Sequence, residues 1–153
     1  MLLVLMSTTV SAALGAPGVL SLREAARLSD EREQAEKAAQ LAAESFTTYD
    51  YRDLSSSFDS LLEAGTDEFR RTFGQATSEL RPIIREQRAV STGNIISSAV
   101  ADLEPGKTSS VLVEVDVYVS QRKGQGPQRR FRLQLDLKEV DGSWLLDKIE
   151  TVT

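Results

Sequence analysis

The chain has 153 residues, of which 41% are hydrophobic and 27% are charged, values that are ordinary for one globular domain with a modest core. Its formal net charge of -5 disfavours a general nucleic-acid binder, because such proteins need surplus Lys and Arg to replace phosphate counterions. Cysteine and histidine are both absent, which excludes disulfides, thiolate chemistry, and the usual general acid/base and ligand of catalytic zinc. We therefore expect no metal, no cofactor and no enzymatic activity.

Residues 1–22 carry no ionisable side chain and form an apolar run that Ser, Thr, Gly and Pro dilute. As a helix, a segment of this length spans roughly 33 Å, enough for a hydrocarbon core of about 30 Å. The run predicts an uncleaved membrane anchor, which we favour, or an export signal cut near residues 13–15. A buried amphipathic helix of a soluble protein is the third interpretation.

Both membrane interpretations place the rest of the chain outside the cytoplasm. We expect a single-pass protein of the plasma membrane with an extracytoplasmic domain. No Lys or Arg precedes the apolar run, so the positive-inside rule gives no support for a cytoplasmic N-terminus. One explanation is that the true start lies upstream of Met1.

The next segment, residues 23–45, is rich in Glu, Ala, Arg, Gln and Lys and lacks Pro and Gly, a composition that favours helix. We expect a charged helix that serves as a stalk below a domain formed by residues 46–153. A single apolar stripe recurs along it at steps of three, four and seven: Leu28, Ala35, Ala39, Ala42 and Phe46.

Two further helices are predicted before the strands. Asp50 is a candidate N-cap for the second, with Asp53 near its positive end and Gly65 just after its last turn. Thr66 is a good N-cap for the third, and Pro82 predicts a kink or break near Arg81. The apolar positions expected to be buried are Leu54, Phe58, Leu61 and Leu62, followed by Phe69, Phe73, Ala76, Leu80, Ile83 and Ile84.

From Val90 onward the hydrophobic period changes from 3.6 to 2. Strands are predicted over about 92–103, 111–119 and 131–137, and a last one begins at Trp144 after an Asp-Gly turn. Four antiparallel strands in succession form a meander, one face of which needs helices to cover it. The predicted fold class is therefore α+β, with helices packed on a curved four-stranded antiparallel sheet.

This order of elements, ending in Asp141-Gly142-Ser143-Trp144-Leu145, resembles the nuclear-transport-factor-2-like (NTF2-like, SnoaL-like) superfold, a cone of helices and curved sheet. A more specific combination is the membrane lead, the charged helix, Phe46-Thr47-Thr48-Tyr49-Asp50-Tyr51, and then Phe69-Arg70 before the meander. It is similar to the actinobacterial Mce-associated membrane proteins. In that family a threonine pair followed by an aromatic-Asp-aromatic element lies at the start of the second helix.

The resemblance implies a non-catalytic accessory or scaffold subunit of an Mce complex, which imports lipids or sterols across the cell envelope. The implied partners are Mce subunits and a membrane permease, and possible contact with lipid. The alternative is a small-molecule-binding protein, or an isomerase- or cyclase-like enzyme of the same superfold, with Asp50 or Asp116 in its pocket.

The candidate ligand-binding residues belong to two sets. Tyr49, Asp50 and Tyr51 are an acid/base cluster in one interpretation, and a helix cap with aromatic packing in the other. Phe58, Phe73 and Trp144, together with Phe46 and Phe69, could line a lipid-sized pocket, although aromatics at helical spacing are also typical of a core.

A basic loop supplies the candidate partner-binding residues, which are Arg122, Lys123, Arg129 and Arg130. Such a loop could meet anionic lipid headgroups or an acidic partner surface. A solvated hairpin tip is the alternative, because the rest of the domain is acidic.

Overall fold

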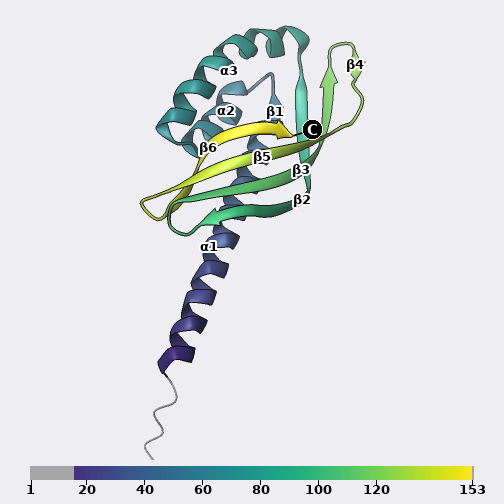
Figure 1. Ribbon diagram of the computed structural model, residues 1–153. Coiled ribbons are helices and arrows are strands. Elements are labelled where there is room, and N and C mark those ends of the chain that lie inside the picture. The colour runs from purple at the N-terminus through teal and green to yellow at the C-terminus, as the bar shows by residue number, and fades with distance from the viewer. Residues whose placement is uncertain (1–15, 153) are drawn as a thin grey trace, which may run out of the picture.

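The computed structural model describes the backbone of residues 16–152 and the side chains of residues 21–152. The predicted α+β class is confirmed: helices come first and lie against one face of a curved antiparallel sheet (Figure 1). The elements are α1 (Ala16–Thr47), β1 (Tyr49–Asp50), α2 (Leu54–Glu63), α3 (Asp67–Gln87), β2 (Val90–Glu104), β3 (Thr108–Gln121), β4 (Gly124–Gln125), β5 (Arg129–Val140) and β6 (Ser143–Val152).

The predicted anchor falls mainly on residues 1–15, which lie outside the described residues. None of the helices in the described part of the chain is long and apolar enough to cross a membrane.

Helix α1 has two parts with different surroundings. Its N-terminal part projects beyond the sheet, and Leu22 is 71% exposed there (Figure 1). Its C-terminal part crosses the inner face of the sheet, where small side chains let the helix approach closely. The second part of the segment 23–45, expected as a stalk, instead belongs to the core through Ala35, Ala39, Ala42 and Ala43.

The sheet has more strands than predicted. Its order is β1-β2-β3-β5-β6, with β4 paired to β3, and every pair is antiparallel. The four expected strands are β2, β3, β5 and β6. The prediction missed β1 and β4, because two residues are too few to show an alternating pattern.

The predicted alternation of buried and outward-facing side chains along β3 and β5 is confirmed. Val111, Val113 and Val115 are buried against α1, and their polar neighbours face outward. Strand β2 contains two register shifts, between Ile95 and Ser97 and between Val100 and Asp102. Such bulges bend a strand, so they help to curl the sheet around the helices.

The helix boundaries confirm two of the predicted signals. Gly65 follows the C-cap of α2, and the Thr66 hydroxyl accepts a hydrogen bond from Phe69 N (3.2 Å) as the N-cap of α3. The expectation of Asp50 as a cap was wrong. Asp53 caps α2 by accepting from Ser56 N (3.2 Å), because Asp50 belongs to β1.

Helix α3 runs without a break through Pro82 to Gln87. Pro82 is exposed, so water can satisfy the carbonyl that its missing N–H leaves without a partner. The predicted burial along α3 was only partly right. Phe69 is buried, whereas Ala76, Leu80 and Ile83 are exposed, because this helix covers the open end of the curled sheet rather than its centre.

Candidate functional site

An apolar hollow of about 420 Å³ lies between α3 and the inner face of the sheet. Most of its wall is made of aromatic and aliphatic side chains, and Leu80, 47% exposed, stands where it opens to solvent. The volume is within the range of small-molecule sites in proteins. The lining residues are Phe46, Thr47, Tyr49, Phe58, Phe73, Thr77, Leu80, Ile84, Ser91, Val117, Val119, Phe131, Leu133 and Thr151.

Phe73 is the centre of the aromatic cluster at this hollow. Its ring centroid lies 5.1 Å from that of Phe69, 6.0 Å from that of Phe46 and 6.1 Å from that of Phe58. These distances and the edge-on contact with Phe58 are favourable for aromatic pairs. The rings of Phe46, Phe58, Phe69 and Phe73 therefore pack on one another along the helical side of the hollow.

Three of the hydroxyl groups that line the hollow donate hydrogen bonds to backbone carbonyls. Thr47 Oγ1 donates to Ala43 O (2.7 Å), Thr77 Oγ1 to Gly74 O (3.1 Å), and Ser91 Oγ to Thr47 O (2.6 Å). Burial raises the pKa of the Tyr49 hydroxyl, so this group stays neutral at physiological pH. The hollow is therefore suited to an apolar group and not to an anion.

Three of the six predicted ligand-binding residues come together here. Tyr49, Phe58 and Phe73 line the hollow, and the Tyr49 and Phe58 rings are 6.4 Å apart. Trp144 does not line it, because it lies on β6 opposite Glu139 and packs in the core at the other end of the sheet. Asp50 and Tyr51 also lie outside the lining.

Asp50 and Tyr51 form no acid/base cluster with the hollow. The Asp50 carboxylate accepts from Arg52 Nε at 2.9 Å and 3.0 Å, and these bonds lower its pKa to about 2. The Arg52 guanidinium also lies 5.8 Å from the centre of the Tyr51 ring. A carboxylate so well paired is a poor general base near neutral pH.

The threonine pair before these residues joins α1 to β2. Thr48 Oγ1 accepts from Gly93 N (3.1 Å), and the Thr47 carbonyl accepts from Ser91 Oγ. Directly after the pair, Tyr49 is opposite Ser91 in the β1–β2 ladder. The most distinctive sequence element of the chain therefore fixes the helix–sheet junction that borders the hollow.

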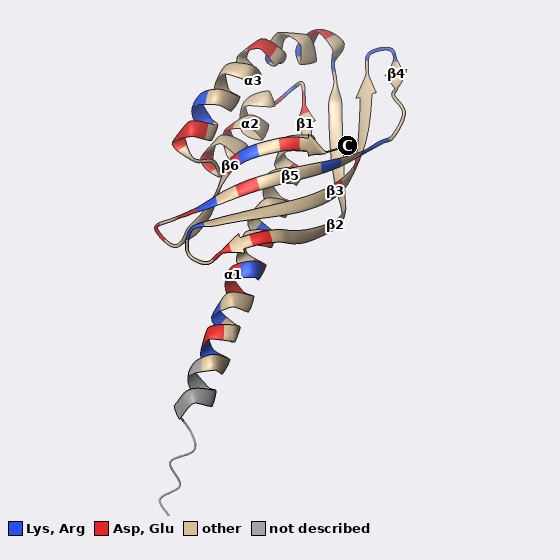
Figure 2. Cartoon of the chain, viewed as in Figure 1, with Lys and Arg blue, Asp and Glu red and all other residues tan. Residues whose placement is uncertain are grey.

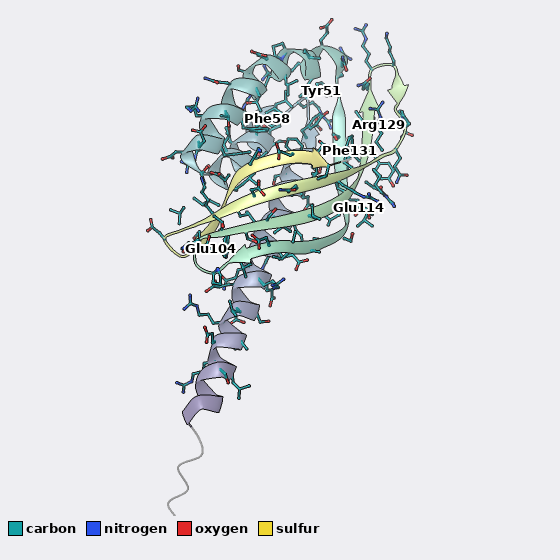
Figure 3. The ribbon with its side chains drawn as sticks, viewed as in Figure 1. Tyr51, Phe58, Glu104, Glu114, Arg129 and Phe131 are labelled. Atoms are coloured by element: carbon teal, nitrogen blue, oxygen red, sulfur yellow. The ribbon has the colours of Figure 1, made fainter. Side chains whose placement is uncertain are left out.

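Sequence reasoning missed the strand side of the hollow. Val117, Val119 and Phe131 line it from β3 and β5. The alternating pattern could have identified them, since all three occupy inward positions of it (Phe131 is labelled in Figure 3).

Asp116, the other carboxylate considered for a pocket, faces the outside of the sheet. It is only 5% exposed, and Arg130 pairs with it bidentately through Nε–Oδ1 (2.7 Å) and Nη2–Oδ2 (2.9 Å). The guanidinium lowers the pKa of Asp116, and the carboxylate raises that of Arg130. Arg130 is therefore engaged in the sheet and does not belong to the basic loop surface.

The other three basic residues of that loop do not form one surface either. Arg122 and Lys123 occupy the exposed turn between β3 and β4. Arg129 instead lines a recess that shares Tyr49 and Phe131 with the hollow; Figure 3 labels Arg129 and Phe131.

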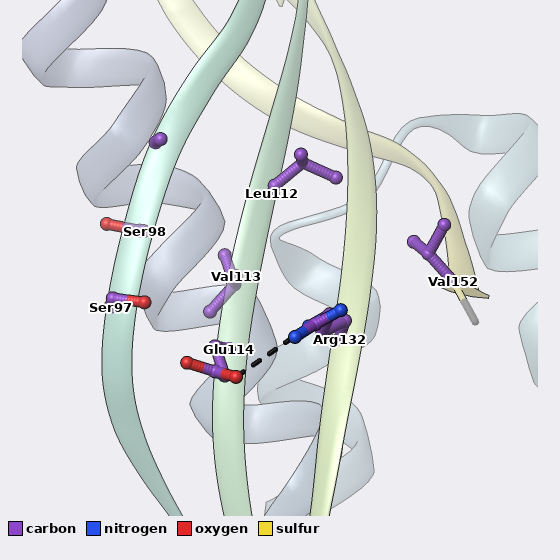
Figure 4. Close-up of a pocket in the computed structure, with 8 residues that line it drawn as sticks. Ser97, Ser98, Leu112, Val113, Glu114, Arg132 and Val152 are labelled. Carbon is purple, nitrogen blue, oxygen red and sulfur yellow. Dashed lines mark ion pairs between the residues drawn. The ribbon is translucent and has the colours of Figure 1, made fainter.

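A second recess of about 420 Å³ lies on the outer face of the sheet (Figure 4). It combines the exposed side chains of Leu112 and Val152 with the Glu114–Arg132 ion pair (3.7 Å), and it has no aromatic lining. Within residues 21–152, no three Asp or Glu side chains gather closely enough to hold a metal ion.

Comparisons with known proteins establish the family and the fold. The model of the family described as "Uncharacterized protein Rv1363c/MT1408-like" matches residues 1–153. A search of curated proteins found no match. Solved structures with a similar fold are an IcmL-like type IV secretion system protein from Legionella pneumophila and the periplasmic domain of DotI.

The IcmL-like protein has 11% sequence identity and a TM-score of 0.65 over 79% of this chain and 91% of that chain. The periplasmic domain of DotI has 12% sequence identity and a TM-score of 0.65 over 76% of this chain and 91% of that chain. CagV, a VirB8 homologue of the type IV secretion system of Helicobacter pylori, has 12% sequence identity and a TM-score of 0.52 over 76% of this chain and 98% of that chain. These likenesses show a shared fold of helices on a curled antiparallel sheet.

Proposed function

This chain belongs to the Rv1363c/MT1408-like family, and from that premise we propose that it is a non-catalytic accessory or scaffold subunit of a complex in the cell envelope. One observation carries the proposal: α1 runs without a break from Ala16, next to the apolar lead, into the core of the domain. A helix built in this way holds a folded domain at a fixed position relative to a tether.

The similar structures support the same role. The IcmL-like protein and CagV are described as type IV secretion system proteins, and the DotI structure is a periplasmic domain. By analogy, we place this domain outside the plasma membrane, with residues 1–22 as its anchor.

The carboxylates support a role without catalysis. Asp50 is held by Arg52 and Asp116 by Arg130, so the two carboxylates considered for an active site are both paired. An acid or base for catalysis needs a pKa near the working pH, whereas these arrangements lower the pKa of both groups.

We further propose that the complex is of the Mce type, which imports lipids or sterols. The element 46–51, the apolar lead and the charged helix support this assignment through their resemblance to Mce-associated membrane proteins. The partners would then be Mce subunits and a permease.

Purification of the tagged full-length protein from membranes of its native host, followed by quantitative mass spectrometry, tests both levels of the proposal. Near-stoichiometric recovery of Mce subunits and a permease is the expected result. Recovery of other envelope proteins in a fixed ratio would keep the scaffold role and overturn the Mce assignment. A protein recovered alone would overturn both, provided that a tagged membrane protein purified in parallel retains its known partners.

The hollow favours a second candidate function, which is the binding of a small apolar molecule. Its aromatic wall and satisfied hydroxyl groups are suited to a hydrocarbon chain. Native mass spectrometry of the purified protein would detect such a ligand as a fixed mass increment.

A further inference from the structure

Basic side chains without an ion pair gather at one end of the domain. All 18 Lys and Arg residues lie in the described part of the chain, and ten of them form ion pairs there. Four of the remaining eight are Arg85, Arg88, Arg122 and Lys123, which we call the basic tip. All four are exposed, in a protein whose formal net charge is -5.

The basic tip is formed by two segments that a hydrogen-bonded junction holds together. Arg122 N donates to Gln87 O (2.8 Å), and Gln121 Nε2 donates to Gln87 Oε1 (3.0 Å). The turn after β3 is thereby held against the end of α3, and Figure 2 shows the basic residues of both segments at the same end of the molecule. Two clusters that lie 34 positions apart in the chain thus form one preorganised surface.

The helix end alone does not explain four cations. Arg85 and Arg88 complement the negative end of the α3 dipole, an effect that is complete within the last turn. Arg122 and Lys123 come from another element and add like charge, which destabilises the isolated domain. Glu86 is the acidic residue of the groove of about 540 Å³ that Gln87, Gln121, Arg122 and Lys123 also line.

The position of the basic tip decides between its two candidate ligands, which are anionic lipid headgroups and an acidic surface of a partner protein. It lies at the end of the molecule opposite the start of α1 (Figure 1). The part of α1 from residue 23 to Thr47 is about 38 Å long. If residues 1–22 are the anchor, as the proposed function holds, the tip faces away from the membrane that carries the anchor. Lipid headgroups of that membrane are then far beyond the reach of electrostatic attraction, which extends about 10 Å.

We propose that the basic tip docks an acidic segment of a partner protein. Opposite charge is the complementarity that such a surface offers, and it acts mainly on encounter and specificity. The groove between the two cation-bearing segments gives the acidic chain a defined seat. The direction that the tip faces rests on the proposed function, whereas the charge and geometry of the tip do not.

A labelled poly-glutamate peptide of about ten residues is the probe, titrated by fluorescence anisotropy against the purified full-length protein in neutral detergent. The test variant is Arg122→Glu/Lys123→Glu. Arg23→Glu/Arg32→Glu is the matched control, because it makes the same change in net charge at two other exposed, unpaired cations. We expect the test variant to bind about tenfold more weakly or worse, and the control to stay within about twofold of the wild type. Raising NaCl from about 50 mM to about 300 mM should weaken wild-type binding.

Equal binding by the wild type and the test variant overturns the proposal, and so does an equal loss in the control. Tip-dependent binding to phosphatidylglycerol vesicles without binding to the peptide would overturn it in favour of a membrane. Circular dichroism of each variant shows whether it is folded. The titration uses the chain alone, so its outcome is independent of which proteins co-purify with the wild type in the test of the proposed function.

Discussion

Gly93 lies so close to Thr47 that a Cβ on this glycine would stand 2.7 Å from the Thr47 Cβ and overlap its hydroxyl oxygen. This contact joins the end of α1 to β2. The Thr47 hydroxyl is already bonded to Ala43 O, so it cannot rotate away without losing that bond. The junction therefore requires glycine at position 93 because of space, since its backbone is not among the positive-φ conformations of the chain.

Gly93→Ala should destabilise the domain by about 1–3 kcal/mol, because an added methyl group must displace a bonded side chain or the backbone. Urea denaturation, followed by the fluorescence of the single tryptophan, measures the free energy of unfolding. Gly74→Ala is the matched control. A Cβ there meets nothing within 4 Å, so this variant should gain about 0.5–1 kcal/mol of helix propensity. Equal stability of the two variants would contradict the predicted clash.

Thr66→Ala should destabilise the domain by about 0.5–2 kcal/mol through loss of the α3 N-cap. The same hydroxyl also donates to Asp147 Oδ1 (2.8 Å), which ties α3 to β6. Thr66→Ser keeps both bonds and should retain most of the stability. If thermal unfolding shows that the serine variant is as unstable as the alanine variant, the packing of the threonine methyl group is the dominant contribution.

Arg130→Met should make stability depend on pH in a different way from the wild type. In the wild type, Arg130 holds the pKa of Asp116 below its unfolded value of about 3.9. The pair therefore stabilises the fold above this pH, and the contribution is lost as the pH falls through the lower, folded-state pKa. Without Arg130, a nearly buried carboxylate is left unpaired, so the variant should be less stable than the wild type at pH 7.

The difference between the wild type and Arg130→Met should shrink as the pH falls below about 4. Denaturation curves between pH 7 and pH 3 measure this difference. Arg132→Met is the control, because the Arg132–Glu114 pair is longer, at 3.7 Å, and Glu114 is more exposed than Asp116. Parallel pH profiles for wild type and Arg130→Met would contradict the assigned role of the Asp116–Arg130 pair.

Val119→Phe should close part of the apolar hollow. Its side chain lines the hollow from β3, and a larger ring there takes the space that an acyl chain would occupy. We expect the affinity for a fluorescent fatty-acid analogue to fall about tenfold. Ile96→Phe, at an exposed position on β2 that does not line the hollow, should leave it unchanged. Binding that neither variant alters would place the analogue elsewhere on the protein.

Periodicity predicted the parts of the fold that depend on many residues. The long strands, the caps at Thr66 and the turn at Asp141-Gly142 follow from local patterns. The depth to which α1 enters the core does not. Ala35 and Ala39 have the same sequence pattern on a free stalk as on a helix that lies against a sheet, and only the packing distinguishes the two.

The candidate sites could not be predicted from local patterns alone, because they depend on contacts between segments that are distant in the sequence. Asp116 looks like an ordinary outward residue of an alternating strand, and its burial depends on Arg130 standing directly opposite in the register. The basic tip likewise depends on the contact of Gln87 with the turn after β3, which no local sequence window contains. The aromatic residues that the helices contribute to the hollow could be predicted from the sequence. The shape of the space between the helices and the sheet could not.

The unbroken course of α1 also makes the direction of the domain a matter of helical phase. Each residue of an α-helix turns the chain by about 100° and advances it by about 1.5 Å. A single residue inserted into the projecting part of α1 would leave every contact in the core intact and yet swing the basic tip and the hollow to another side of the helix axis. Four inserted residues would nearly restore the original direction, about 6 Å further out. The length of the projecting helix therefore determines the direction in which the basic tip and the hollow face.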